Sequence, residues 1–422
     1  MKLDINQIYK LFLLISMSFY IGLIDFVNRL FTGGVSYGDM EGASSGNIVN
    51  QLLGLSLLGF IFVFLRFSSV FSISAALKSG KIWWLLIAFF AASIVWSYEP
   101  TVSIRRIIAF STLIVTCYSL AVIFSAKTLI TFVAELIFWV TLVGFLYHFG
   151  TGGGLSFGFG DRAAAMRGIY FDKNGAARVY AYGIILFFAL KRYATWSDIT
   201  KIAILSFALL TSASASGVVM AFFGVGLLFV FNLFKARTKQ QTLLQFVILI
   251  LALFLGAYLV SVLYELLLAA LGRDPELSNR AIIWELIFPL IEDEWLKGYG
   301  FGAFWASSAV QGFVERWGFI GNAHSGYLEV LLHGGIIGLV ILILIFLNHL
   351  KHVLALYLER REDDLSSLFF VLLIIQLVVN AVGYVILNHN SFDMFLFTLL
   401  YFVAVKQYLT KSVGKNVWVS ER

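Results

Sequence analysis

The stretch SGYLEVLLHGGIIGLVILILIFL, residues 325–347, indicates the fold class of this chain. After Glu329 it contains no Asp, Glu, Lys or Arg, and Leu, Ile and Val make up most of it. A helix needs about 20 mostly apolar residues to cross the hydrocarbon core of a bilayer. The stretch therefore predicts a membrane-spanning helix.

The rest of the chain has the same character. Of its 422 residues 60% are hydrophobic and only 13% are charged, whereas a soluble protein carries roughly 25% charged residues. This composition excludes a soluble enzyme, and a scan for apolar stretches predicts about twelve membrane-spanning helices. The other predicted spans lie near 8–30, 48–67, 82–97, 104–124, 128–149, 176–191, 199–214, 217–235, 243–264, 366–387 and 392–410.

We therefore predict an all-α polytopic membrane protein in which residues 1–422 form a single integral membrane domain. With the N-terminus inside, 19 of the 30 Lys and Arg residues fall on the cytoplasmic side, which places both termini in the cytoplasm. The formal charge of +6 is then explained by topology and does not indicate a nucleic-acid partner. One large extracytoplasmic loop is expected at 265–323, with an amphipathic helix near 281–290.

This loop contains a candidate anion site in the stretch LGRDPELSNRAIIW, residues 271–284. Arg273 and Arg280 lie seven residues apart, and Arg280 opens the predicted helix after a Ser-Asn cap. A planar guanidinium together with the free N–H groups of a helix N-terminus suits a phosphate group. The alternative is an ordinary ion pair between Arg280 and a neighbouring carboxylate.

A candidate base lies in the stretch GNAHSGYLE, residues 321–329. With Asn322 as the cap of the following helix, His324 falls in the first turn, where the helix dipole favours a neutral imidazole that can accept a proton. The alternative is a structural or snorkelling histidine. Glu329 lies one turn deeper, at membrane depth, and is expected to face a cavity or a partner such as an outer-loop arginine.

A third candidate is Arg167, which follows the glycine-rich segment 150–160. It is interpreted either as a second anion clamp or as a residue that contacts lipid headgroups. No Gly-Lys-Ser/Thr follows, so the glycines do not indicate a nucleotide site. Neither the acidic triplet 292–294 nor the scattered histidines have a convincing metal-ligand pattern, and the single cysteine, Cys117, excludes an internal disulfide. We predict no metal and no cofactor.

Together these stretches resemble the O-antigen ligase and polymerase superfamily of bacterial membrane glycosyltransferases. Arg280 and Trp284 are similar to its G-R-x-x-x-W loop motif, and 322–328 is similar to its A-H-N-x-Y-L motif, with Ser325 in place of the Asn. Further similar elements are the Gly-aromatic run 297–302, the glycines 334–338, the W-S-x-x-P…R-R element at 96–106 and the R-x-G…N element at 167–174. The cation of the family's S-x-S-[RK] element is missing from 212–216.

The resemblance implies a metal-independent, inverting glycosyltransferase that acts at the outer face of the bacterial inner membrane. Its donor would be a glycan linked to undecaprenyl diphosphate. We favour a polymerase that joins O-antigen or exopolysaccharide repeat units. The alternatives are an O-antigen ligase, which transfers the glycan to lipid A-core, and, in another class, a non-enzymatic flippase for lipid-linked oligosaccharides. Expected partners are membrane lipids and other assembly proteins, such as a flippase and a chain-length regulator.

The resemblance also implies roles for individual residues. His324 would act on the acceptor hydroxyl, and Arg280 would bind and stabilise the diphosphate leaving group. The remaining predicted residues are those expected to bind the diphosphate or the glycan: Arg273, Arg167, Trp284, Asn322, Tyr327 and Glu329.

Overall fold

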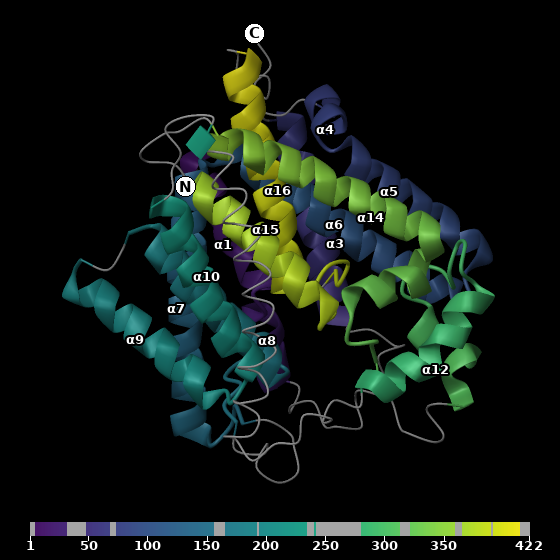
Figure 1. The fold of residues 1–422 in the computed structure, drawn as a ribbon, viewed down its shortest axis with the longest axis horizontal. Coiled ribbons are helices and arrows are strands. Elements are labelled where there is room, and N and C mark those ends of the chain that lie inside the picture. Colours follow the sequence, from purple (N-terminus) through teal and green to yellow (C-terminus); the bar gives the residue numbers. More distant parts are fainter. Residues whose placement is uncertain are drawn as a thin grey trace. The chain divides into compact units, whose positions relative to one another are not determined.

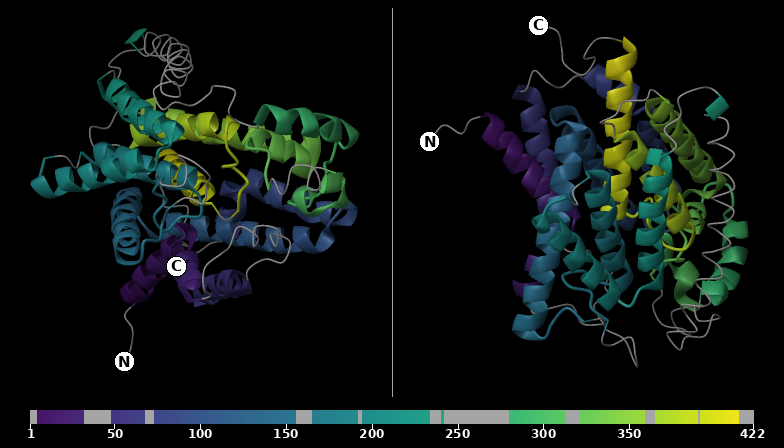
Figure 2. Two further views of the ribbon diagram at one scale, coloured as in Figure 1. Left: turned by 90° about the horizontal axis from the view of Figure 1, so that it is seen from below. Right: turned by 60° about the vertical axis from the view of Figure 1, so that its left-hand side comes forward.

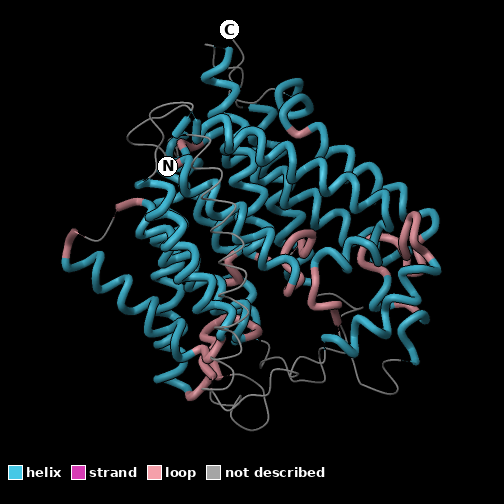
Figure 3. The backbone as a smooth tube through the Cα atoms, in the orientation of Figure 1, coloured by secondary structure: helices cyan, strands magenta, loops and turns pink. Residues whose placement is uncertain are grey.

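The computed structural model describes most of the chain as helices joined by turns (Figure 3). Every regular element in the described part is a helix, apart from an isolated pairing between Leu155 and Met166. The described residues are 5–31, 48–67, 73–155, 165–191, 194–233, 240–241, 280–312, 321–358, 365–389 and 391–413.

The helices confirm an all-α integral membrane protein. Within the described residues five helices are long and apolar enough to cross a membrane, or six when the bent pair α1 (Ile5–Tyr20) and α2 (Leu23–Phe31) is taken as one span. The five segments are Pro100–Ile123, Ala126–Thr151, Ala215–Asn232, Gly326–Leu358 and Phe392–Thr410. The count of twelve stays a prediction, and the predicted span at 243–264 lies outside the described residues.

Two predicted spans differ from the structure. The span predicted at 8–30 is not one straight helix, because the chain bends by 68° between α1 and α2. Gly22, at this bend, has a φ of +88°, which a residue with a Cβ adopts at a cost. The helix expected at 366–387 is too long, since α15 (Ser366–Ala381) ends where the Asn380 side chain accepts a hydrogen bond from the N–H of Ile386.

The chain forms two compact units, and α14 and α15 contribute residues to both. The first unit comprises Met1–Ala126, Arg280–Val353 and Gln376–Arg422, and the second Lys127–Asn279 and Leu354–Ile375. The first unit contains the following helices in addition to α1 and α2 (Figure 1): α3 (Ile48–Phe67), α4 (Ile73–Ser79), α5 (Lys81–Ala92), η2 (Ser93–Trp96), α6 (Pro100–Ile123), α12 (Arg280–Asp293), η4 (Phe304–Ala306), η5 (Ser308–Val310), most of α14 (Gly326–Leu358) and α16 (Phe392–Val413). The prediction of a single membrane domain is not tested by this division.

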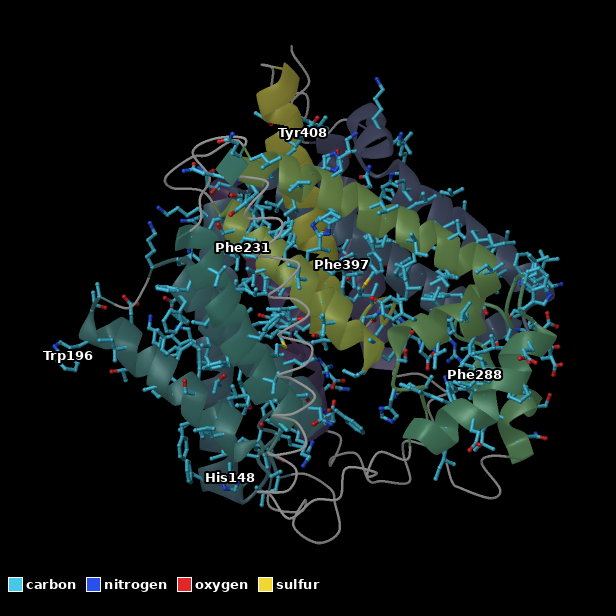
Figure 4. The ribbon with its side chains drawn as sticks, in the orientation of Figure 1. His148, Trp196, Phe231, Phe288, Phe397 and Tyr408 are labelled. Atoms are coloured by element: carbon cyan, nitrogen blue, oxygen red, sulfur yellow. The ribbon has the colours of Figure 1, made fainter. Side chains whose placement is uncertain are left out.

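An aromatic cluster forms the core of the first unit. Trp83 of α5 is fully buried, and its ring lies against Phe110 of α6 and against Phe397 and Tyr401 of α16 at centroid distances between 5.7 and 6.3 Å. Phe397 is labelled in Figure 4. Aromatic rings bury large apolar areas and favour these tilted and edge-on arrangements. The cluster therefore holds α5, α6 and α16 together.

The end of α6 is fixed by a lysine of α16. Lys406 Nζ lies 2.8 Å from the carbonyl oxygens of Ala121 and Val122 and 3.3 Å from that of Phe124. The last carbonyls of a helix have no partner within the helix and carry the negative end of its dipole. The ammonium group thus donates hydrogen bonds to carbonyl oxygens that would otherwise lie without a partner in apolar surroundings.

The helix α14 is broken at Gly335, and the segment that contains the Gly-aromatic run forms backbone hydrogen bonds beside this break. Gly335 has φ 56° and ψ −155°, a conformation essentially confined to glycine. Around it the carbonyl of Leu332 accepts from the N–H of Tyr299 at 2.8 Å, and the N–H of Ile336 donates to the carbonyl of Trp295 at 2.8 Å. The segment after α12 is therefore held by backbone groups that a continuous helix would have used itself.

The second unit contains α7 (Ala126–Thr151), α8 (Lys173–Ala189), α9 (Trp196–Thr211) and α10 (Ala215–Leu233), together with residues of α14 and α15. α8 lies beside α9 and α10 (Figure 2). Gly217 allows α10 to approach Ala177 of α8 closely. Lys201 of α9 makes a salt bridge of 2.8 Å with Glu135 of α7, which pairs two charges within apolar helices.

Candidate active site

A hydrogen bond joins the two motifs of the large loop. The indole N–H of Trp284, on α12, donates to the carbonyl of Ala323 at 2.8 Å. Arg280 is the first residue of α12, as predicted, and lies four residues before Trp284 on the same face of the helix. Its Cα is therefore about 6 Å from that of Trp284. This contact brings the start of α12 close to the turn that carries His324.

His324 lies in a strained turn and not in the first turn of a helix. α14 begins at Gly326, and His324 has a φ of +50°. The prediction of a helical position is wrong because the Asn322 side chain accepts from the N–H of His324 at 2.9 Å and so forms a local turn before the helix. A non-glycine residue in this conformation costs on the order of 1–3 kcal/mol and persists only where its surroundings fix it.

Glu329 supports this turn from within α14. Its side chain is fully buried, and Oε1 accepts from the backbone N–H of Ala323 at 2.5 Å and from the indole N–H of Trp305 at 2.9 Å. Oε2 lies 3.2 Å from Nε2 of His333. Among the described residues, its neighbours are thus a backbone N–H, an indole and an imidazole. The outer-loop arginine expected from the sequence stays a prediction, because Arg273 and the side chain of Arg280 lie outside the described residues.

Both backbone polar groups of Ala323 are bound by side chains. Its N–H is bound by Glu329 and its C=O by Trp284, and Ala323 itself is fully buried within an apolar cluster that includes Ile283 and Ile287 of α12. Both polar groups of a buried residue must find partners, since an unsatisfied one costs as much as a lost hydrogen bond. Here the partners are two of the residues that the sequence analysis predicted to bind substrate.

Two more predicted binding residues use their polar groups inside the protein. Tyr327 donates its hydroxyl to the carbonyl of Leu377 at 2.9 Å, which ties α14 to α15. In the second unit Arg167 is only 7% exposed, and its guanidinium donates to backbone carbonyls of the surrounding loop. These bonds go to Leu155 at 2.6 Å, Tyr170 at 2.8 Å and Phe171 at 3.3 Å. Arg273 and the side chain of Arg280 lie outside the described residues.

Several residues beside this turn were not predicted from the sequence. Trp305 and His333 both contact Glu329, and Phe301, fully buried, stacks on Phe90 of α5 at 4.3 Å and meets the ring of His333 edge-on at 5.4 Å. His333 carries no zinc-type spacing and so gave no signal. Trp305 lies three residues after the Gly-aromatic run and could have been noticed there.

Two further polar side chains lie beside the Gly-aromatic run: Arg106 of α6 and His389, on the segment between α15 and α16. Arg106 packs against Gly302, where a Cβ would collide with its side chain. Burial, with a smaller contribution from the Arg106 guanidinium, lowers the pKa of His389 to about 3. The imidazole of His389 is therefore neutral at physiological pH. Arg106 belongs to the R-R element that the sequence analysis noted without assigning it a role.

The acidic triplet at 292–294 has a structural contact. The hydroxyl of Tyr98 donates to Glu294 at 3.0 Å, and this hydrogen bond raises the pKa of Tyr98. Lys297 lies 5.7 Å from the ring centre of Trp96. In the part of the chain that the structure describes, no group of three or more His, Cys, Asp or Glu side chains is placed to hold a metal ion.

Comparison with known proteins gives two matches. The family model described as O-Antigen ligase matches residues 201–343. The exopolysaccharide production protein ExoQ of Rhizobium meliloti (strain 1021) is 26% identical over 320 residues, which cover 69% of each chain. The family match contains both of the motifs that the hydrogen bond between Trp284 and Ala323 joins.

Proposed function

We propose that this chain, which belongs to the O-antigen ligase and polymerase superfamily, transfers a glycan from an undecaprenyl diphosphate carrier to an acceptor hydroxyl at the outer face of the bacterial inner membrane. The observation that carries this proposal is the hydrogen bond between Trp284 and Ala323. It joins a helix that begins with an arginine to a turn that presents a histidine. An anion-binding group and a proton acceptor are the two parts that this transfer needs.

Arg280 acts on the leaving group. When the bond between the anomeric carbon and the carrier phosphate breaks, its electrons pass to the diphosphate oxygen, and negative charge builds there. A guanidinium can donate two parallel hydrogen bonds to phosphate, and the free N–H groups at the start of α12 favour an anion. Arg273, seven residues before the start of α12, is the second cation of this site in our proposal.

His324 acts on the acceptor. Its imidazole takes the proton of the acceptor hydroxyl while that oxygen forms the new bond to the anomeric carbon, on the face opposite the diphosphate. The result is inversion at that carbon without a metal or another cofactor. Asn322 holds the turn through its bond to the N–H of His324.

The geometry also suggests how the remaining predicted residues serve this reaction. Tyr327, through its bond to Leu377, fixes the start of α14 against α15. Arg167 shapes its own loop through three bonds to backbone carbonyls. We therefore assign these two residues to the framework around the site and not to direct contact with the diphosphate.

The acceptor distinguishes the polymerase from the ligase. We favour a polymerase because ExoQ, which is 26% identical, is named as an exopolysaccharide production protein. The test is a transfer assay with purified protein and a lipid-linked donor, in which the acceptor is either a second lipid-linked repeat unit or lipid A-core. We expect product only with the second lipid-linked unit. Product only with lipid A-core would make the chain a ligase.

The same assay addresses the other class of function. A flippase moves a lipid-linked oligosaccharide and forms no glycosidic bond, so it would give no product with either acceptor and would instead transport the donor across vesicles. The membrane enzyme of our proposal works beside a separate flippase, which supplies the donor, and a chain-length regulator, and it contacts membrane lipids along its apolar helices.

We predict that the loop at 265–323 lies on the outer side of the membrane. Ser308 is exposed in this loop, whereas Lys81 is exposed at the start of α5, at the end of that helix away from the contact between Tyr98 and Tyr299. A Ser308→Cys variant should react with a membrane-impermeant maleimide in spheroplasts, and Lys81→Cys should react only after lysis. The native Cys117 is fully buried and gives little background. The reverse pattern would overturn this topology.

A further inference from the structure

His324 needs external support to keep its conformation. It is a non-glycine residue at a φ of +50°, and its two neighbours, Ala323 and Ser325, lie in the turn that precedes α14. Asn322 holds the N–H of His324 itself. The backbone N–H and C=O of Ala323, the residue before His324, are bound by two side chains from different helices.

We propose that Glu329 and Trp284 are positioning residues, which clamp Ala323 by binding its backbone N–H and C=O and thereby fix the direction of the His324 imidazole. This inference rests on the proposed role of His324 as the base. It replaces the expectation that Glu329 and Trp284 contact the substrate.

Burial and geometry support the role of Glu329. The carboxylate is fully buried, yet Oε1 is directed at two N–H groups, those of Ala323 and the Trp305 indole. A buried carboxylate is costly unless it is hydrogen-bonded or paired, so its presence in an apolar helix points to a specific task. His333, one turn further along α14, lies 3.2 Å from the second oxygen, Oε2.

The role of Trp284 follows from its place on α12. Because the indole N–H donates to the carbonyl of Ala323, this hydrogen bond adds a directional contact to the apolar packing between α12 and the turn. Arg280 lies one helical turn away on the same face. Trp284 therefore couples the position of His324 to that of Arg280, and a change at this residue is expected to disturb both.

Transfer kinetics and amide exchange test the clamp together. In Glu329→Leu the Ala323 N–H loses its acceptor, and we expect the turnover rate to fall about 10²-fold, since a displacement of a catalytic group by about 1 Å can cost that much. The KM for the donor should change little. Glu329→Gln keeps an oxygen that accepts both N–H bonds, so it should lose less than about tenfold. In Trp284→Phe the ring remains and the donor is lost, and we expect an intermediate effect.

A matched control separates the clamp from the general effect of losing an indole hydrogen bond. Trp84, at the start of α5, donates its indole N–H to the carbonyl of Ala76 at 2.9 Å, which is the same kind of bond away from the turn. Trp84→Phe should keep the wild-type transfer rate. An equal loss of rate in Trp84→Phe and Trp284→Phe would contradict a specific role for Trp284.

The second readout does not depend on activity. Hydrogen exchange of the peptide that contains 321–326 should be slow in the wild type, faster in Glu329→Leu and Trp284→Phe, and slow again in Glu329→Gln. Unchanged exchange in Glu329→Leu would overturn the clamp. If Glu329→Leu does not fold, the other two variants still test the clamp. Exchange should be faster in Trp284→Phe and should stay slow in Glu329→Gln.

Double variants distinguish a failure of this inference from a failure of the proposed function. If Glu329 acts through His324, then Glu329→Leu should cost nothing further in a His324→Ala background. A further large loss there would show that Glu329 has a role independent of His324. That result would contradict the clamp but not the proposed base. Wild-type transfer by His324→Ala would instead contradict the proposed base, and with it the purpose of the clamp.

Discussion

Replacing His324 with Asn is expected to reduce the transfer rate by about 10²- to 10⁴-fold, the usual contribution of a general base. Asn is the informative substitution because His324 has a φ of +50°, and Asn adopts this conformation more readily than most residues. The variant therefore keeps the turn and its hydrogen bonds but cannot take a proton at neutral pH. His324→Ala should lose at least as much activity, since it adds strain to the loss of the base.

The measurement is single-turnover transfer by purified protein with a saturating lipid-linked donor. Donor binding should be nearly unchanged, because the proposed role concerns the acceptor hydroxyl. A His148→Asn variant is the matched control: His148 lies at the end of α7 and contacts the carbonyl of Gly153 at 2.8 Å (Figure 4). It should transfer at the wild-type rate. A wild-type rate in His324→Asn would show that His324 is not the base.

The membrane helices could be predicted where length and composition decide the structure. The segments at 104–124, 128–149 and 325–347 correspond to α6, α7 and α14 within a few residues at most ends, although α14 continues to Leu358. The breaks could not be predicted. The apolar run continues through Gly22 and Gly335, and only tertiary contacts, such as the bond from Ile336 to Trp295, show why the helix opens at Gly335.

The candidate site was located by its motifs, but its internal contacts could not be read from them. Trp284 and Ala323 are separated by 39 residues, and their hydrogen bond depends on how α12 packs against the turn. Glu329 was noticed because an ionisable group within an apolar helix needs a partner. Nothing in the local sequence shows that one of its partners is the indole of Trp305, and none of the described contacts joins it to an arginine.

The effect of Arg280→Lys is expected to be a loss of about 10²- to 10³-fold in turnover, although the charge is kept. An ammonium is a single point of charge, whereas a guanidinium matches two phosphate oxygens at once. Removing one preorganised donor from an oxyanion site typically costs this much. The start of α12 should still form, because Lys and Arg have similar helix propensities.

The control for Arg280→Lys is the same substitution at Arg29, whose side chain pairs with Asp25 at 3.1 Å on α2. A lysine can keep such a single contact, so Arg29→Lys should transfer at the wild-type rate. The effect of Arg280→Lys should also fall mainly on turnover and less on the KM for the acceptor, because charge builds on the diphosphate only as its bond breaks. If properly inserted Arg280→Lys turned over like the wild type, the diphosphate would have to be stabilised elsewhere. Arg273 would then be the next residue to substitute, since it lies in the same loop and the same motif.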